Sequence, residues 1–202
     1  PATAFRVLQL AEKHDFLIVE DDIYGDLAPD AATRLVSLDQ LSRVIYTSSF
    51  SKTISGNLRV GFISCRPDLA HRFTDVKIVT MMSSAELSEQ RVHQLLTDGH
   101  YRKLVERLKG RLAEAAGQAL RMLERVGLQP DPEPRGGPFV WARVPGLADT
   151  SELARRAARD NILLAPGSVF RPQSQPSGYL RFNVGFCADP RLERFLGDTR
   201  KT

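Results

Sequence analysis

Two short motifs place reactive side chains directly after apolar runs. Asp21 and Tyr24 follow the apolar residues 16–19, and Ser49 and Lys52 follow a second run at 43–48. In open α/β sheets, ligands bind outside the carboxyl ends of the strands. A carboxylate there can pair with a cation, and a lysine flanked by hydroxyls can act as a Schiff-base nucleophile. The structural alternatives are a loop acid that caps a turn and a solvent-exposed lysine.

Two arginines extend this pattern toward anion recognition. Arg59 lies seven residues after Lys52, just before a third apolar run. Its planar fork of donors suits a phosphate, and the hydroxyls of Ser49 and Ser51 suit the same group. Arg181 is a lone charge in an otherwise apolar strand pattern, and a buried guanidinium needs an anion. Arg181 therefore predicts either a structural salt bridge or a site for a substrate carboxylate.

The elements that must position these residues follow from hydrophobic periodicity. The pattern predicts helices over 5–14, 67–78, 84–96, 101–126, 150–159 and 190–196, and strands over 16–19, 43–50, 60–65, 139–144, 162–164 and 179–186. Residues 25–42 read as a loop, and prolines and glycines punctuate 130–138. We therefore expect a partial α/β domain over 1–83, connecting helices over 84–127 and a small α+β domain over 128–202. Trp141 is expected in the core of that small domain.

Composition narrows the class of protein. The chain has 202 residues, of which 42% are hydrophobic and 26% charged, and a net charge of +4; these values are ordinary for a globular chain. Two cysteines, Cys65 and Cys187, are too few for a disulfide framework and match no metal-ligand spacing, so we expect reduced thiols in a cytoplasmic protein. The scattered basic residues lack the aromatic interleaving of a nucleic-acid interface, and no apolar run approaches the length of a membrane span.

Taken together and in this order, the motifs resemble the class I/II aminotransferases, which are pyridoxal-phosphate-dependent transferases of fold type I. The segments that carry the resemblance are EDDIYGDL, SSFSKTISGNLRVGF, LAPGSVF and YLRFNVGF. The implied fold is α/β: the C-terminal part of the large cofactor-binding domain followed by the small α+β C-terminal domain. The chain opens without Met and a predicted helix begins as early as residue 5, so we expect a C-terminal piece of a longer polypeptide that by itself binds the cofactor weakly and does not transaminate.

The resemblance also implies a role for each residue of the cofactor site. Lys52 would bond covalently to the aldehyde of pyridoxal 5'-phosphate and move the substrate proton. Asp21 would pair with the pyridine nitrogen, and Tyr24 would donate to the phenolic oxygen. Ser49 and Arg59 would hold the phosphate.

Two assignments leave alternatives open. Arg181 would bind the carboxylate of an amino acid or 2-oxo acid ligand, if it is not held in a structural salt bridge. Asp22 could replace Asp21 as the partner of the pyridine nitrogen, although the spacing to Tyr24 favours Asp21.

Within this superfamily the chain most resembles the aminotransferase-like domain of MocR-type regulators of the GntR family. In such a regulator the domain binds the cofactor as an effector sensor, and DNA is bound only by a separate N-terminal domain. The alternative is a free-standing amino acid aminotransferase, and a scaffold without cofactor is a third class. The resemblance further implies a homodimer.

Overall fold

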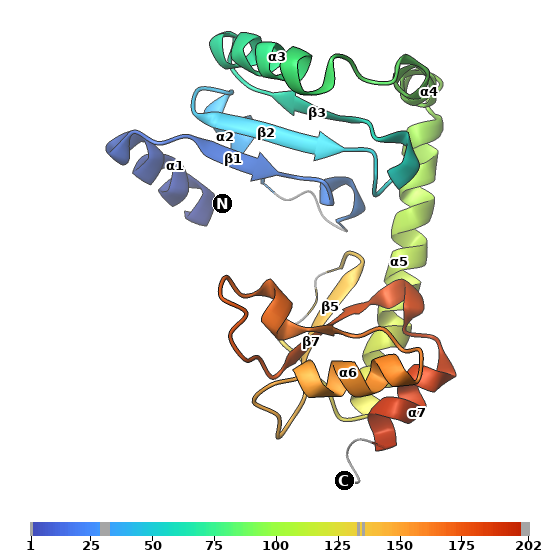
Figure 1. Ribbon diagram of the computed structural model, residues 1–202. Helices are drawn as coiled ribbons and strands as arrows, with labels where there is room; N and C mark the ends of the chain where they lie inside the picture. Colours follow the sequence, from blue (N-terminus) through green and yellow to red (C-terminus); the bar gives the residue numbers. More distant parts are fainter. Residues whose placement is uncertain (1, 29–32, 133, 135, 199–202) are drawn as a thin grey trace. The chain divides into compact units, whose positions relative to one another are not determined.

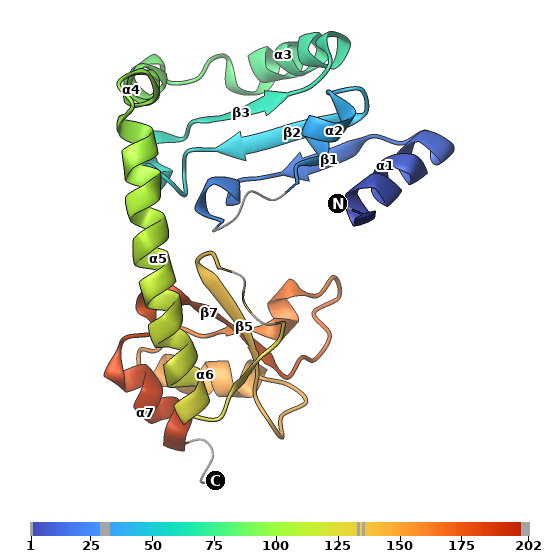
Figure 2. The same cartoon turned by 180° about the vertical axis from the view of Figure 1, so that it is seen from behind.

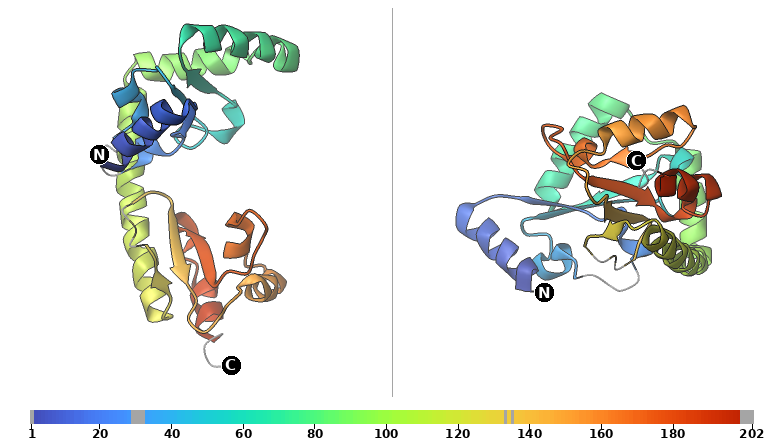
Figure 3. Two further views of the ribbon diagram at one scale, coloured as in Figure 1. Left: turned by 90° about the vertical axis from the view of Figure 1, so that its left-hand side faces the viewer. Right: turned by 90° about the horizontal axis from the view of Figure 1, so that it is seen from below.

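The computed structural model describes residues 2–28, 33–132, 134 and 136–198, and the chain divides into two compact units. The first unit comprises residues 1–108 and the second residues 109–202. Each unit has its own sheet, which the turned views also show (Figures 1 to 3).

The sheet of the first unit has three strands in the order β1-β2-β3: β1 (Ile18–Asp21), β2 (Val44–Ser49) and β3 (Gly61–Ser64). β1 pairs with β2 in parallel, and β3 pairs with β2 antiparallel. The surrounding helices are α1 (Ala2–His14), α2 (Leu35–Asp39), α3 (Pro67–Met81) and α4 (Glu86–Thr97), with short 3-10 turns η1 (Gly25–Leu27) and η2 (Gly56–Leu58). Helix α5 (His100–Arg125) begins in this unit.

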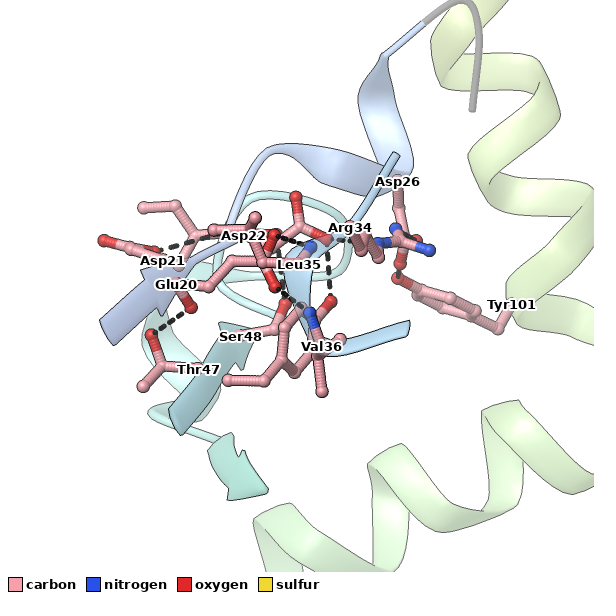
Figure 4. Close-up of polar contacts among 12 residues, drawn as sticks. Glu20, Asp21, Asp22, Asp26, Arg34, Leu35, Val36, Thr47, Ser48 and Tyr101 are labelled. Carbon is pink, nitrogen blue, oxygen red and sulfur yellow. Dashed lines mark hydrogen bonds and ion pairs between the residues drawn. The ribbon is translucent and has the colours of Figure 1, made fainter. Parts of the chain in front are cut away.

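Glu20 explains why a short helix forms between β1 and β2. Its two carboxylate oxygens accept hydrogen bonds from the backbone N–H groups of Leu35 and Val36, at 2.8 and 2.9 Å (Figure 4). These N–H groups lie in the first turn of α2, where helices leave donors unsatisfied. A side chain of β1 thus stabilises the start of α2.

The first unit exposes many of its apolar side chains. Val19 of β1 is 65% exposed, Ile63 of β3 is 53% exposed, and Val79 of α3 is 85% exposed.

The sheet of the second unit is antiparallel, in the order β4-β5-β7-β6. Its strands are β4 (Gln129–Pro130), β5 (Phe139–Arg143), β6 (Ala165–Pro166) and β7 (Tyr179–Asn183); the helices are the C-terminal part of α5, α6 (Ser151–Arg159) and α7 (Pro190–Asp198), and the 3-10 turns are η3 (Gly167–Phe170) and η4 (Val184–Phe186).

One face of this sheet forms the core of the second unit. Val140 and Ala142 of β5 and Leu180 and Phe182 of β7 are buried in a cluster that includes residues of α5, α6 and α7. The opposite face carries Phe139, Trp141, Tyr179 and Arg181, because side chains alternate along a strand.

Most predicted elements form, but several expectations were wrong. The residues at 162–164 are not a strand: the strand of that region is β6, and Leu163 is 95% exposed. The predicted strand at 179–186 ends at Asn183 and continues as the 3-10 turn η4. The region 25–42 contains η1 and α2 where only loop was expected. Trp141 lies on the open face of the sheet, not in the core.

No helix among the described residues is long and apolar enough to cross a membrane.

Candidate active site

The cofactor residues predicted in the first unit meet at one edge of its sheet. Asp21 is the last residue of β1 and Ser49 is the last residue of β2. These strands are parallel, so both carboxyl ends lie at the same edge. β3 runs in the opposite direction and its first residue pairs with Ser49, so Arg59 reaches this edge as well. The carboxyl edge of parallel strands is the usual ligand-binding edge of such sheets.

Asp21 and Asp22 have different surroundings (Figure 4). The Asp21 side chain is exposed and accepts one bond, at 3.3 Å, from the backbone N–H of Ile23. The Asp22 side chain is 19% exposed, and its Oδ2 accepts from Arg34 Nε at 2.6 Å and from the Tyr46 hydroxyl at 2.7 Å. Asp22 is therefore occupied in a structural ion pair, whereas no cation of the described residues pairs with Asp21.

The Asp22 network also changes the acidity of its partners. Burial, followed by the hydrogen bond to Asp22, raises the pKa of Tyr46 to about 12. The hydrogen bond to Asp22 is the main cause that raises the pKa of Arg34. Arg34 Nη2 also lies 3.6 Å from Asp26 Oδ1, so Arg34 forms ion pairs with two carboxylates of the segment after β1.

Lys52 and Tyr24 lie next to each other at this edge. Lys52 Nζ lies 5.9 Å from the centroid of the Tyr24 ring. Lys52 is exposed, and no carboxylate in the described parts of the chain forms an ion pair with it. An accessible amine without a partner is available as a nucleophile once it is deprotonated.

Hydroxyl groups and Arg59 surround the turn that carries Lys52. Ser49 Oγ lies 2.9 Å from Ser51 Oγ, accepts from the Ser51 backbone N–H at 3.1 Å and donates to the carbonyl of Val60 at 3.1 Å. Arg59 has φ of +54°, a left-handed conformation that is uncommon for residues other than glycine. Strained backbone of this kind is concentrated at functional sites. The exposed Arg59 guanidinium donates a long bond, 3.4 Å, to the carbonyl of Gly56.

Close backbone approach explains the glycine at the start of β3. A Cβ at Gly61 would lie 2.9 Å from the carbonyl oxygen of Ser48, closer than such atoms approach. The pairing of β3 with the end of β2, and with it the position of Arg59, therefore depends on this glycine.

Arg181 lies in the second unit, in the central strand β7, and is held by aromatic rings. Its Cζ lies 4.3 Å from the ring centroid of Phe139 and 4.3 Å from that of Phe170. Among the described residues no carboxylate pairs with it, so the structural salt bridge considered above is not formed. Cation–π contacts stabilise a guanidinium without consuming its N–H donors, which stay available for an anion.

The aromatic contacts of Arg181 continue along the open face of the sheet. Trp141 packs edge-on against Phe170 with ring centroids 5.4 Å apart and stacks on Tyr179 at 5.5 Å. The Tyr179 hydroxyl donates to Asp131 at 2.8 Å. Phe170, one of the two rings that contact Arg181, is thus itself held by Trp141.

Several residues of these networks could not be singled out from the sequence. Asp26, Arg34, Tyr46 and Tyr101 meet only through the tertiary fold, since Tyr101 bonds to a residue 75 positions earlier. Phe139 could have been found from the sequence, because strand alternation places its side chain on the same face of the sheet as Arg181. Phe170 could not, because it lies in the 3-10 turn η3, where side chains do not alternate as in a strand.

Comparison with known proteins identifies the family. The family model described as "Aminotransferase class I and II" matches residues 2–197. A 2-aminoadipate transaminase of Thermus thermophilus is 34% identical over 82% of this chain, which covers 43% of that protein. The HTH-type transcriptional regulator TauR of Rhodobacter capsulatus is 31% identical over 81% of this chain, which covers 34% of it.

The solved structures agree on the fold. The α-aminoadipate aminotransferase LysN of Thermus thermophilus, complexed with N-(5'-phosphopyridoxyl)-L-leucine, superposes over 100% of this chain with a TM-score of 0.86 and 28% identity. The chain covers 54% of LysN, so it spans about half the length of this relative. The expected α/β fold of fold-type I aminotransferases is thereby confirmed, and the chain belongs to the class I and II aminotransferase family.

Proposed function

We propose that this chain binds pyridoxal phosphate at the carboxyl edge of the first sheet, with Lys52 as the residue that bonds to the cofactor aldehyde. The observation that carries the proposal is the convergence of Asp21, Ser49 and Arg59 on one sheet edge, with Lys52 and Tyr24 in contact beside it. The set fits the cofactor chemically: it offers an amine, a carboxylate, a phenol, a hydroxyl and a guanidinium.

Each side chain then has a defined task. The Asp21 carboxylate favours the protonated form of the pyridine nitrogen, because a nearby negative charge stabilises the cation. Tyr24 donates to the phenolic oxygen, and Ser49 and Arg59 donate to the phosphate. After the substrate amine has replaced it at the cofactor aldehyde, the freed Lys52 amine would accept and return the proton of the substrate α-carbon. When bound, the cofactor supplies an electron sink for the electrons left on that carbon.

Arg181 is proposed to bind the carboxylate of an amino acid or 2-oxo acid. Its planar fork of donors matches a carboxylate in a bidentate geometry. Phe139 and Phe170 limit its motion, which reduces the entropy lost on binding.

For the polypeptide that carries this chain, we propose an effector-sensing role in a MocR-type regulator of the GntR family, acting as a homodimer with DNA bound by a separate domain. The similarity to TauR and to the regulators YdfD and YjiR supports it. A second candidate, a free-standing amino acid aminotransferase, is supported by the 34% identity to the Thermus transaminase.

Chemical trapping tests the cofactor site. Borohydride reduction of the intact polypeptide with pyridoxal phosphate should label Lys52 and leave Lys77 and Lys103 unlabelled, as read by peptide mass mapping. Lys52→Ala should lose both the label and the visible absorption band. A label on another lysine in the unmodified protein would refute the assignment.

Turnover and DNA binding separate the two candidates. An effector sensor should bind an amino acid and change its affinity for an operator fragment without sustained transfer of amino groups. A free-standing aminotransferase should show steady turnover with an amino acid and a 2-oxo acid, and no amino-acid-dependent DNA binding. Arg181→Leu should weaken amino-acid binding in both cases while cofactor binding persists.

A further inference from the structure

Tyr101, in the first turn of α5, contacts both segments that carry the proposed cofactor residues. Its hydroxyl lies 2.5 Å from a carboxylate oxygen of Asp26, to which it donates, and 3.2 Å from the hydroxyl of Thr53 (Figure 4 shows the Asp26 contact). Its ring meets the Phe50 ring edge-on, with centroids 5.7 Å apart. One side chain therefore joins the segment after β1 to the segment after β2.

The two contacted residues are close neighbours of Tyr24 and Lys52 in the chain. Asp26 lies two residues after Tyr24, in the turn closed by a 2.9 Å bond from the backbone N–H of Leu27 to the carbonyl of Tyr24. Thr53 directly follows Lys52 and is only 5% exposed, although Lys52 itself is exposed. Fixing Asp26 and Thr53 to one hydroxyl restrains the backbones on which Tyr24 and Lys52 are placed.

The bond to Asp26 persists through the ordinary pH range. Burial, followed by the hydrogen bond to Asp26, raises the pKa of Tyr101 to about 12. The phenol therefore keeps its proton and remains a donor. Arg34, 3.6 Å from Asp26 and bonded to Asp22, holds the carboxylate from its other side.

We infer that Tyr101 is a positioning residue of the cofactor site, which sets the placement of the Lys52 amine relative to the Tyr24 ring by tying Asp26 and Thr53 to one hydroxyl. This inference rests on the proposed function. Tyr101 does not touch the cofactor in this scheme. It fixes the distance between the Lys52 amine and the Tyr24 ring, which is 5.9 Å in the structure. The surroundings of the lysine–cofactor bond depend on this distance.

The test compares Tyr101→Phe with Tyr46→Phe in the intact polypeptide. Both substitutions remove one hydroxyl that donates to an aspartate of the same region, but Tyr46 bonds to Asp22 and has no bond to the Lys52 segment among the described residues. We expect Tyr101→Phe to weaken pyridoxal phosphate binding about tenfold, the value of one hydrogen bond to a charged group. It should also shift the pH midpoint of the visible absorption band, whereas Tyr46→Phe should leave both readouts unchanged.

The outcomes separate positioning from stability and from the proposed function. Wild-type affinity and an unshifted midpoint in Tyr101→Phe would overturn the positioning role, as would equal effects of the two substitutions. Asp26→Asn tests the same link from its other end and should shift the midpoint in the same direction. Absence of a visible band in the unmodified protein, or its persistence in Lys52→Ala, would refute the proposed function itself and with it the positioning role.

Discussion

The neighbouring carboxylates Asp21 and Asp22 offer a crossed test, because the structure gives them opposite roles. Asp22 accepts two bonds on one oxygen, from Arg34 and Tyr46, whereas Asp21 is exposed and accepts a single backbone bond. Asp22→Asn should therefore lower stability while the cofactor site is retained. Asp21→Asn should weaken cofactor binding while stability is retained.

The magnitudes follow from these contacts. An asparagine at 22 can still accept a bond through its carbonyl oxygen but loses the charge, and charge-assisted bonds are about twice as strong as neutral ones. Each of the two bonds then weakens by about 1 kcal/mol. Arg34 is 39% exposed, so water screens part of its share. We expect Asp22→Asn to reduce the free energy of unfolding by about 1–2 kcal/mol.

Asp21→Asn should change stability by less than about 0.5 kcal/mol, because the side chain is exposed and an amide oxygen can accept the same backbone bond. Loss of the fixed charge beside the pyridine nitrogen should weaken pyridoxal phosphate binding about 10- to 100-fold. Urea denaturation gives the first quantity and titration of the visible band gives the second, each on both variants. The reversed result, in which Asp22→Asn loses the cofactor at full stability and Asp21→Asn binds normally, would refute the assignment.

Three further predictions concern other parts of the chain. Phe170→Leu should weaken amino-acid binding about two- to fivefold, because Arg181 loses one of its two ring contacts; calorimetric titration with unchanged affinity would contradict this. Leu180→Ala should reduce the free energy of unfolding by about 2–5 kcal/mol, because the side chain is fully buried in the second core; a urea midpoint like that of the wild type would count against it. Folded Tyr46 has a pKa of about 12 against an ordinary 10.0, so its stabilising effect is complete below pH 10 and is lost as the pH rises toward 12. Tyr46→Phe should therefore flatten the fall of stability over this interval, and identical slopes would argue against the raised pKa of Tyr46.

The order of elements was largely predictable because it depends on local pattern. The strands expected over 16–19 and 43–50 form as β1 and β2, which end at Asp21 and Ser49, so the predicted ends were close to the observed ones. The spacing to Tyr24 favours Asp21 over Asp22, and this choice stays a prediction; the structure adds that Asp22 is already paired with Arg34. The failures also have local causes. The apolar residues 162–164 satisfy a strand pattern, but a short apolar run gives the same signal in a connecting segment, where Leu164 is buried and Leu163 is exposed.

The contacts between residues far apart in the chain could not be predicted from the sequence. Nothing in the pattern joins Tyr101 to Asp26 across 75 residues, or shows that Phe139 and Phe170 hold Arg181 in place of an acid. Periodicity reports which face of an element is buried, and a resemblance reports which residues belong to a site. The sequence by itself therefore determined the family, the strand ends and the reactive groups at them. Only the tertiary structure decided how those groups are held, because hydrogen bonds and ring contacts between distant segments depend on distances that exist only after the chain has folded.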